Sequence, residues 1–136
     1  MLELGLRYGD GPVLMRELAD SQQVSADYLE QLMGPLRRAG LIRTVRGARG
    51  GYQLAKVPDH ITVKEIVDAL EGRQSPADLA NNSDKNAPPR WQHSAAHDLW
   101  REMEEAANDV LRRTSLGELC RRQREKDKQR APQYAI

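Results

Sequence analysis

The spacing of the apolar residues changes at Gly40, and this change constrains the fold more than any other feature of the sequence. Before it, apolar residues recur every three or four positions from Tyr28 to Leu36, which predicts a helix. After it, residues 41–47 and 51–56 alternate apolar and polar side chains, which predicts two strands. The short glycine-rich stretch "ARGG" joins them, so we expect a hairpin directly after a helix.

Helical spacing recurs on both sides of this hairpin. Ser25 is a suitable N-cap for the helix before it, and Leu14 and Leu18 are expected to face inward from an earlier helix. Thr62 and Glu65 form a T-x-x-E capping box. The predicted fold class is mainly α with a small two-stranded β wing: a winged helix-turn-helix plus a long C-terminal helix. The predicted helices cover residues 1–9, 13–23, 24–40, 61–72, 93–113 and 115–126.

The composition excludes several classes of protein. One cysteine among 136 residues allows no intrachain disulfide, which suits a reducing cytosol. No apolar run approaches the ~18 residues that would span a membrane. The sequence contains no recognisable nucleophile–base pair, paired carboxylates or phosphate-binding loop, so we predict that it is not an enzyme. Hydrophobic residues make up only 39% and Phe is absent, which favours a second copy completing the core.

The helix that begins after Ser25 has the position of a recognition helix. In a helix-turn-helix, the second helix of the motif lies in the major groove and its first residues meet base edges. Glu30 can accept a hydrogen bond from a cytosine amine, and Gln31 can pair with adenine. Other side chains of the first turns can equally contact phosphate. The candidate contacts are Ser25, Asp27, Tyr28, Glu30 and Gln31.

A run of positive charge follows this helix. From Leu36 to Lys56 inclusive there are six basic residues and no acidic one, although the formal net charge of the chain is only +1. Each phosphate that a basic side chain neutralises releases counterions, which supplies affinity for DNA. The glycines let the hairpin turn tightly, and an arginine at its tip suits a narrow minor groove. The candidates here are Arg37, Arg38, Arg46, Arg49 and Gly50.

Several segments resemble the Rrf2 family of bacterial transcription regulators, and within it the members that sense iron–sulfur clusters. They are "YLEQLMGPLRRAGLIRTVRGARGGYQLAK", "ITVKEIVDALEG" and "HDLWREMEEAANDVLRRTSLGEL". The resemblance implies a cytoplasmic, nucleoid-associated homodimer that binds double-stranded operator DNA and controls iron–sulfur cluster biogenesis genes. It implies that Tyr28, Glu30 and Gln31 contact bases or backbone and that Arg46 contacts DNA from the wing. A well-known relative has a small hydroxyl residue at the position of Asp27. This difference leaves the base preference open.

The resemblance also implies how the chain is organised. In the family, long C-terminal helices cross to form the dimer, which assigns that role to the predicted long helix. Its apolar residues are Leu99, Trp100, Met103, Val110 and Leu111. We therefore expect a DNA-binding domain at 1–72, a loop in the cluster-binding region at 73–91, dimerisation helices at 92–126 and a flexible tail at 127–136. Family members carry further residues before the segment "MLELGLRYG", so the first helix is expected to be truncated.

The ligands of an iron–sulfur cluster are absent from the matching positions. Cluster-binding members use three cysteines in the loop before the long helix and a histidine at its start. His97 stands at the histidine position, but the loop contains no cysteine, and alanine supplies no ligand. We expect no cofactor for this chain, and a [2Fe–2S] cluster only in the related sensor form. The remnant positions are Ala80, Ala87, Ser94, Ala95, Ala96 and His97.

Two interpretations of the alanines stay open. The chain is either a naturally cluster-free regulator that responds to a small molecule or partner protein, or a cluster sensor whose cysteines were replaced; the scatter of alanines favours the second. His93 and His97 lie four apart without a convergent third ligand, so they predict no metal site. Cys120 is expected to be a small buried hydrophobe. A winged helix that binds a protein in place of DNA is a further alternative, against which the acid-free stretch 36–56 argues.

Overall fold

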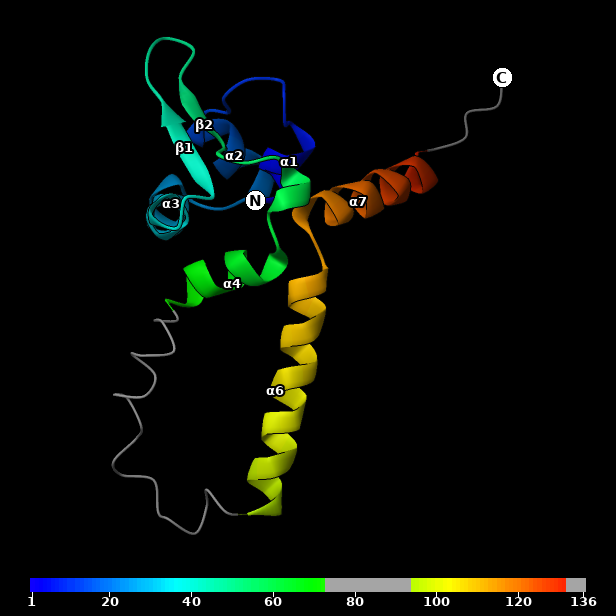
Figure 1. Cartoon of the computed structure of the whole chain (residues 1–136). Helices are drawn as coiled ribbons and strands as arrows, with labels where there is room; N and C mark the ends of the chain where they lie inside the picture. Colours follow the sequence, from blue (N-terminus) through cyan, green and yellow to red (C-terminus); the bar gives the residue numbers. More distant parts are fainter. Residues whose placement is uncertain (73–93, 132–136) are drawn as a thin grey trace.

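The computed structural model describes residues 1–72 and 94–131 and confirms the predicted fold class. A helical body carries the two-stranded sheet, and two long helices leave it in different directions (Figure 1). The elements are α1 (Leu2–Leu6), α2 (Met15–Gln22), α3 (Ala26–Arg38), β1 (Ile42–Val45), β2 (Gly51–Leu54), η1 (Pro58–His60), α4 (Val63–Glu71), α6 (Ala95–Arg113) and α7 (Leu116–Arg130). In these described ranges, no helix is both long and apolar enough to cross a bilayer.

Side-chain caps start three of the helices where the sequence predicted them. The Ser25 hydroxyl accepts a hydrogen bond from the Tyr28 N–H at 3.2 Å, and α3 follows. At α4 the capping box is complete, because Thr62 accepts from the Glu65 N–H at 3.1 Å and Glu65 accepts from the Thr62 N–H at 2.8 Å. The Ser115 hydroxyl caps α7 in the same way at 3.0 Å.

The hairpin is attached to the body by a residue far away in the sequence. Strands β1 and β2 are antiparallel, with Ile42 opposite Leu54. On its other edge, β2 pairs with Val13, and Val13 and Tyr52 exchange two backbone hydrogen bonds of 2.8 Å. The expectation that Leu14 faces inward is wrong, because this pairing buries Val13 and neighbouring residues of extended backbone point in opposite directions. Leu14 is 48% exposed.

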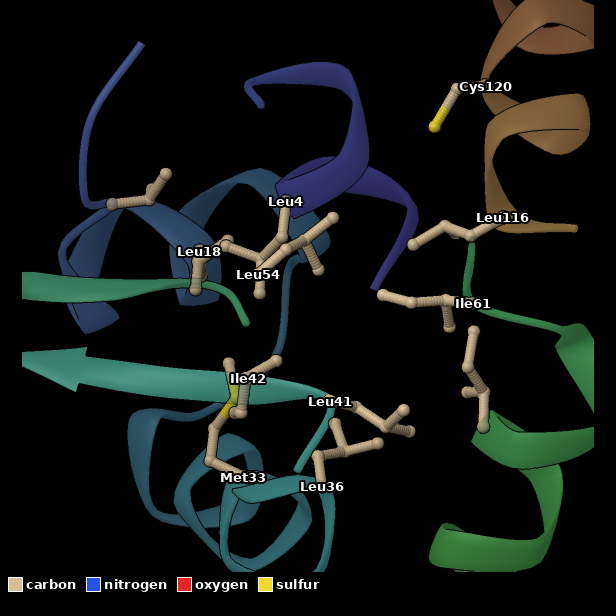
Figure 2. Packing of buried hydrophobic residues seen from close by; sticks show 12 residues of the cluster. Leu4, Leu18, Met33, Leu36, Leu41, Ile42, Leu54, Ile61, Leu116 and Cys120 are labelled. Atoms are coloured by element: carbon tan, nitrogen blue, oxygen red, sulfur yellow. The ribbon is translucent and has the colours of Figure 1, made fainter. Parts of the chain in front are cut away.

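The hydrophobic core draws residues from both ends of the chain. Figure 2 shows Leu18, Leu54 and Ile42 packed over Met33, while Ile61, Leu116 and Cys120 close the opposite side. Cys120 is only 2% exposed, as predicted for a small buried hydrophobe. The core therefore joins the helix-turn-helix to α7 and crosses the domain boundary that the sequence placed at residue 72. Its buried members are Leu4, Val13, Leu18, Met33, Leu36, Leu41, Ile42, Leu54, Ile61, Ile66, Leu116 and Cys120.

Backbone pairing fixes where α4, α6 and α7 meet. Thr62 and Ser115 form an isolated antiparallel bridge. The Val63 N–H donates to the Thr114 carbonyl at 2.9 Å, and the Leu116 N–H donates to the Ile61 carbonyl at 2.8 Å. Because this bridge lies between the end of α6 and the starts of α4 and α7, it sets the directions of all three helices.

Several helix ends differ from the sequence prediction, and α1, for example, ends at Leu6 and not at residue 9. Helix α7 continues to Arg130, beyond the predicted end at Lys126, and so includes the first residues of the segment expected to be a flexible tail. Helix α3 ends at Arg38, before the predicted end at residue 40, and contains Pro35 in its last turns. The loop predicted at 73–91, with Ala80 and Ala87, falls on residues 73–93, which lie outside the described residues.

Removing the Thr62 hydroxyl should destabilise the fold. Thr62→Ala leaves the first turn of α4 without its side-chain acceptor, so we expect the free energy of unfolding to fall by about 1 kcal/mol. Thr62→Ser is the matched control because it keeps the hydroxyl. Urea denaturation at equal protein concentration, followed by circular dichroism, measures both variants. Equal stability of the alanine and serine variants would contradict the role of the cap.

Candidate DNA-binding surface

The exposed face of α3 carries polar side chains along its whole length. Asp27, Glu30, Gln31 and Arg38 follow the three-four spacing of one helix face, and all are exposed. The opposite face buries Met33 and Leu36 in the core. The sequence therefore folds α3 with its hydrogen-bonding groups in solvent and its apolar groups inside, which is the arrangement that insertion into a groove requires.

The start of α3 offers further hydrogen-bonding groups. The Ser25 oxygen accepts from the Tyr28 N–H, which leaves its own O–H as a donor. Tyr28 is 53% exposed. Helix α3 and the hairpin lie on the side of the body away from α7 (Figure 1). The structure thus brings the predicted α3 contacts and the predicted wing to the same side of the molecule.

Within the described ranges, four arginines of this surface take part in no ion pair, whereas some arginines of α6 and α7 do. In α6 and α7, Arg112 bonds Asp109 at 3.1 Å and Arg122 bonds Glu118 at 2.9 Å. Among the described residues, by contrast, the predicted contact arginines are exposed and take part in no ion pair. A guanidinium without an internal partner is available to a phosphate. These arginines are Arg37, Arg38, Arg46 and Arg49.

Arg43 is held within the hairpin. It lies opposite Gln53 in the strand register. With the Gln53 amide turned so that its oxygen faces the guanidinium, Arg43 donates two hydrogen bonds of 2.6 Å to that oxygen. The unengaged positive charge of the hairpin is therefore at its tip, on Arg46 and Arg49.

Gly50 shapes the hairpin tip from inside. The sequence placed Gly50 among the contact residues, but the structure buries it. Its N–H donates to the Gly47 carbonyl at 2.9 Å, and a Cβ at this position would collide with the backbone carbonyl oxygen of Val45. At the neighbouring Gly51, whose φ is +148°, an added Cβ would likewise collide with the backbone carbonyl of Val13. These two glycines permit the close backbone approaches that aim Arg46 and Arg49 outward.

Sequence reasoning missed Tyr52 as the anchor of the hairpin. Its two backbone hydrogen bonds to Val13 fix the hairpin on the body. The signal in the sequence is weak, because Val13 belongs to no strand and lies far from Tyr52 along the chain. Only the glycine at position 51, where the chain passes Val13 closely, hints at such an approach.

The residues at the predicted cluster position do not fit a [2Fe–2S] cluster. Such clusters are held mainly by cysteine thiolates, and the sequence has one cysteine. Cys120 is buried against α1, and burial raises the pKa of its thiol, which disfavours the thiolate. Ser94 and His97 lie at the first turn of α6, where the Ser94 hydroxyl accepts from the His97 N–H at 3.2 Å. Ser94 thus acts as a helix cap.

Helix α6 exposes the apolar residues that the sequence assigned to a dimer interface. Over the described residues, no side chain of this helix is buried, although it is 19 residues long. Leu111 is half-buried and lines a hollow against Val67 of α4. The others, Leu99, Trp100, Met103 and Val110, are each about half exposed or more.

The chain is similar to known transcriptional regulators along most of its length. The family Rrf2, described as an iron-dependent transcriptional regulator, matches residues 1–122. The regulator CymR of Bacillus subtilis is 38% identical over 120 residues, covering 88% of this chain and 80% of CymR. Its solved structure, that of the global cysteine regulator of B. subtilis, has a TM-score of 0.68 at 37% identity, covering 88% of this chain and 85% of that one.

Similarity to IscR regulators is comparable. IscR of Aliivibrio salmonicida is 35% identical over 119 residues, covering 88% of this chain and 69% of that protein. The solved structure of T. potens IscR has a TM-score of 0.73 at 32% identity and covers 99% of this chain and 83% of that one. These similar proteins are transcriptional regulators, and both structures share the winged helix-turn-helix arrangement seen here.

Adding a methyl group at Gly50 should distort the hairpin tip. Gly50→Ala places a Cβ against the Val45 carbonyl, and we expect the free energy of unfolding to fall by about 1–3 kcal/mol. Ala48→Ser, in the same turn but exposed, is the control and should change stability by less than about 0.5 kcal/mol. Thermal unfolding compares the two variants. A Gly50→Ala protein as stable as the wild type would show that the turn does not need glycine.

Proposed function

Since the chain belongs to the Rrf2 family of transcriptional regulators, we propose that it binds operator DNA as a homodimer, with α3 in the major groove and the hairpin in the adjacent minor groove. One observation carries this proposal: the arginines of α3 and the hairpin tip are exposed, take part in no ion pair among the described residues, and lie in the stretch 36–56, which contains no acidic residue. Arginines without an internal ion pair supply an affinity for DNA that falls as the salt concentration rises.

Some residues of this surface position the protein on the phosphate backbone, and others discriminate between base sequences. Arg37, Arg38 and the Ser25 hydroxyl are placed to hold phosphates on either side of α3, and the hairpin arginines enter the minor groove. Glu30 and Gln31 meet base edges, where Gln31 pairs with adenine and Glu30 accepts from a cytosine amine. Because a carboxylate near phosphate is repelled unless it finds a donor, Glu30 is the residue that most restricts which operators bind.

The dimer forms through α6. Exposed Leu99, Met103 and Val110 follow one side of a helix that buries none of its described side chains on its own body. A helix with such a stripe gains its stability by covering it. A two-fold axis crossing α6 lets each copy present the same stripe to the other.

The target genes follow from the resemblance. We propose genes of iron–sulfur cluster biogenesis, controlled in the bacterial cytoplasm by a signal other than a cluster held through cysteines. The similarity to CymR, a global cysteine regulator, makes cysteine metabolism the alternative. Sequencing genomic fragments that the purified protein retains distinguishes the two sets of operators. Restoring cysteines at Ala80 and Ala87 and one of Ser94, Ala95 or Ala96, followed by anaerobic reconstitution, tests whether the loop derives from a cluster site.

Removing the hairpin arginines should weaken the dependence of DNA affinity on salt. For Arg46→Gln with Arg49→Gln, the slope of log affinity against log salt should fall by about 0.9 for each phosphate that the variant no longer neutralises. The probe is an operator selected from a random duplex library. Arg112→Gln removes one charge from a paired arginine on α6 and should leave the slope unchanged. If both variants keep the wild-type slope, the hairpin does not contact phosphate, and the winged-helix protein-interaction module becomes the better function.

A charge on the apolar side of α6 should separate the dimer. Met103 is 56% exposed in one chain, and Met103→Glu would bury an unpaired carboxylate between two copies. We expect the dimer dissociation constant to rise by at least about tenfold, measured by sedimentation. Arg101→Glu, an exposed position on another side of α6, is the control for added negative charge. A dimer equally tight in both variants would place the interface elsewhere.

A further inference from the structure

Helix α6 carries an acidic stripe beside its apolar one. Asp98, Glu102, Glu105 and Asp109 are spaced four, three and four residues apart, which places them on one face of the helix. All four are exposed. Over the described part of the chain, Glu102 and Glu105 take part in no ion pair, and Asp109 bonds only the neighbouring Arg112. This face is negatively charged, and among the described residues its only ionic partner is Arg112.

The outer half of α7 carries a matching basic stripe. Arg122, Lys126 and Arg130 follow one another every four residues and are exposed. Arg121, one residue or about 100° around the helix from Arg122, is tied to Asp59 of the body at 2.9 Å, so the stripe lies to one side of the face of α7 that contacts the body. Among the described residues, Lys126 and Arg130 take part in no ion pair.

The two stripes do not meet within one chain. Only two residues separate α6 from α7, and Figure 1 shows the helices leaving their junction in different directions. None of the ion pairs in the described residues joins one helix to the other. Because the complementary stripes of one chain lie on diverging helices, a second copy of the chain is a partner that can bring one stripe against the other.

We propose that, in the dimer, the basic stripe of α7 from one copy lies along the acidic stripe of α6 from the other. This rests on the proposed pairing through α6. The acidic stripe lies about 100° around the helix from the apolar stripe, and thus at the rim of that interface. A two-fold axis that crosses α6 brings the first turns of one α6 near the end of the other, where its α7 begins. The two stripes lie side by side when the two α6 helices cross at about the angle at which α7 leaves α6.

A second copy fits this helix better than DNA does. Helix α7 interleaves Glu118, Glu125 and Asp127 with its basic residues, so it lacks the acid-free run of basic residues that marks the DNA-binding surface at 36–56. The α6 stripe, by contrast, is acidic at all four positions and spans three helical turns, long enough to accompany the two-turn basic stripe. Because an isolated exposed ion pair contributes little, the stripes act as a network.

This arrangement is tested by reversing the charges of each stripe separately and then of both stripes together. The α7 variant is Arg122→Glu with Lys126→Glu, and the α6 variant is Glu102→Lys with Glu105→Lys. Each should raise the dimer dissociation constant about tenfold at low salt, measured by sedimentation of the full chain without DNA. The chain that carries all four substitutions should return to within about threefold of the wild type, because opposite charges face each other again.

The control changes the same charge on the other side of α7. Arg124→Glu with Lys128→Glu should leave dimerisation unchanged. The proposal is overturned if the chain with all four substitutions dimerises no better than the α7 variant. It is also overturned if the α7 variant dimerises like the wild type but binds the selected operator more weakly, because DNA would then be the partner of the basic stripe. A wild-type chain that stays monomeric defeats the proposed dimer as well, whereas a wild-type dimer indifferent to both reversals defeats this inference alone.

Discussion

The backbone pairing of residues 61–63 with residues 114–116 is the constraint on which the arrangement of the helices depends. It places Ile61 and Leu116 against each other with at most 1% of either exposed. It also starts α4 and α7 side by side and ends α6 beside them. Helix α4 packs on both α3 and α6, so a change in the direction of α6 reaches the recognition helix through one short, well-capped helix. A coupling between partner helices and DNA contact needs such a path.

The DNA-binding surface combines rigid support with unengaged charge. Strand β2 of the hairpin pairs with Val13 on one side and with β1 on the other, and the glycines at positions 50 and 51 permit these close backbone approaches. The arginines at its tip have no internal partner among the described residues, so no intramolecular ion pair has to break when phosphate arrives. A fixed scaffold with free guanidinium groups lowers the ordering cost of binding.

Local features of the fold were predictable from the sequence, whereas long-range contacts were not. The Ser25 cap, the Thr62–Glu65 box and the hairpin follow from residue types at short spacing. The exposure of Leu14, the burial of Gly50 and the anchoring of Tyr52 depend on Val13 or on carbonyls that no local pattern identifies. The exposed face of α3 was predictable from the same three-four spacing as the helix itself. That its arginines form no ion pair could be established only from the positions of the carboxylates in the described part of the chain.

The core contains residues from α1 and α7, which has a consequence for synthesis of the protein. Leu116 and Cys120 pack with Ile61 and Leu4, so the side of the core that they close stays open to water until they have been made. A ribosome adds residues in order, and at about 5–20 residues per second the helix-turn-helix waits several seconds for its last neighbours. During that interval the nascent regulator displays apolar surface and a finished hairpin together. Completion of the fold is therefore tied to the C-terminal part of the message, and a chain cut short before α7 lacks one wall of its core.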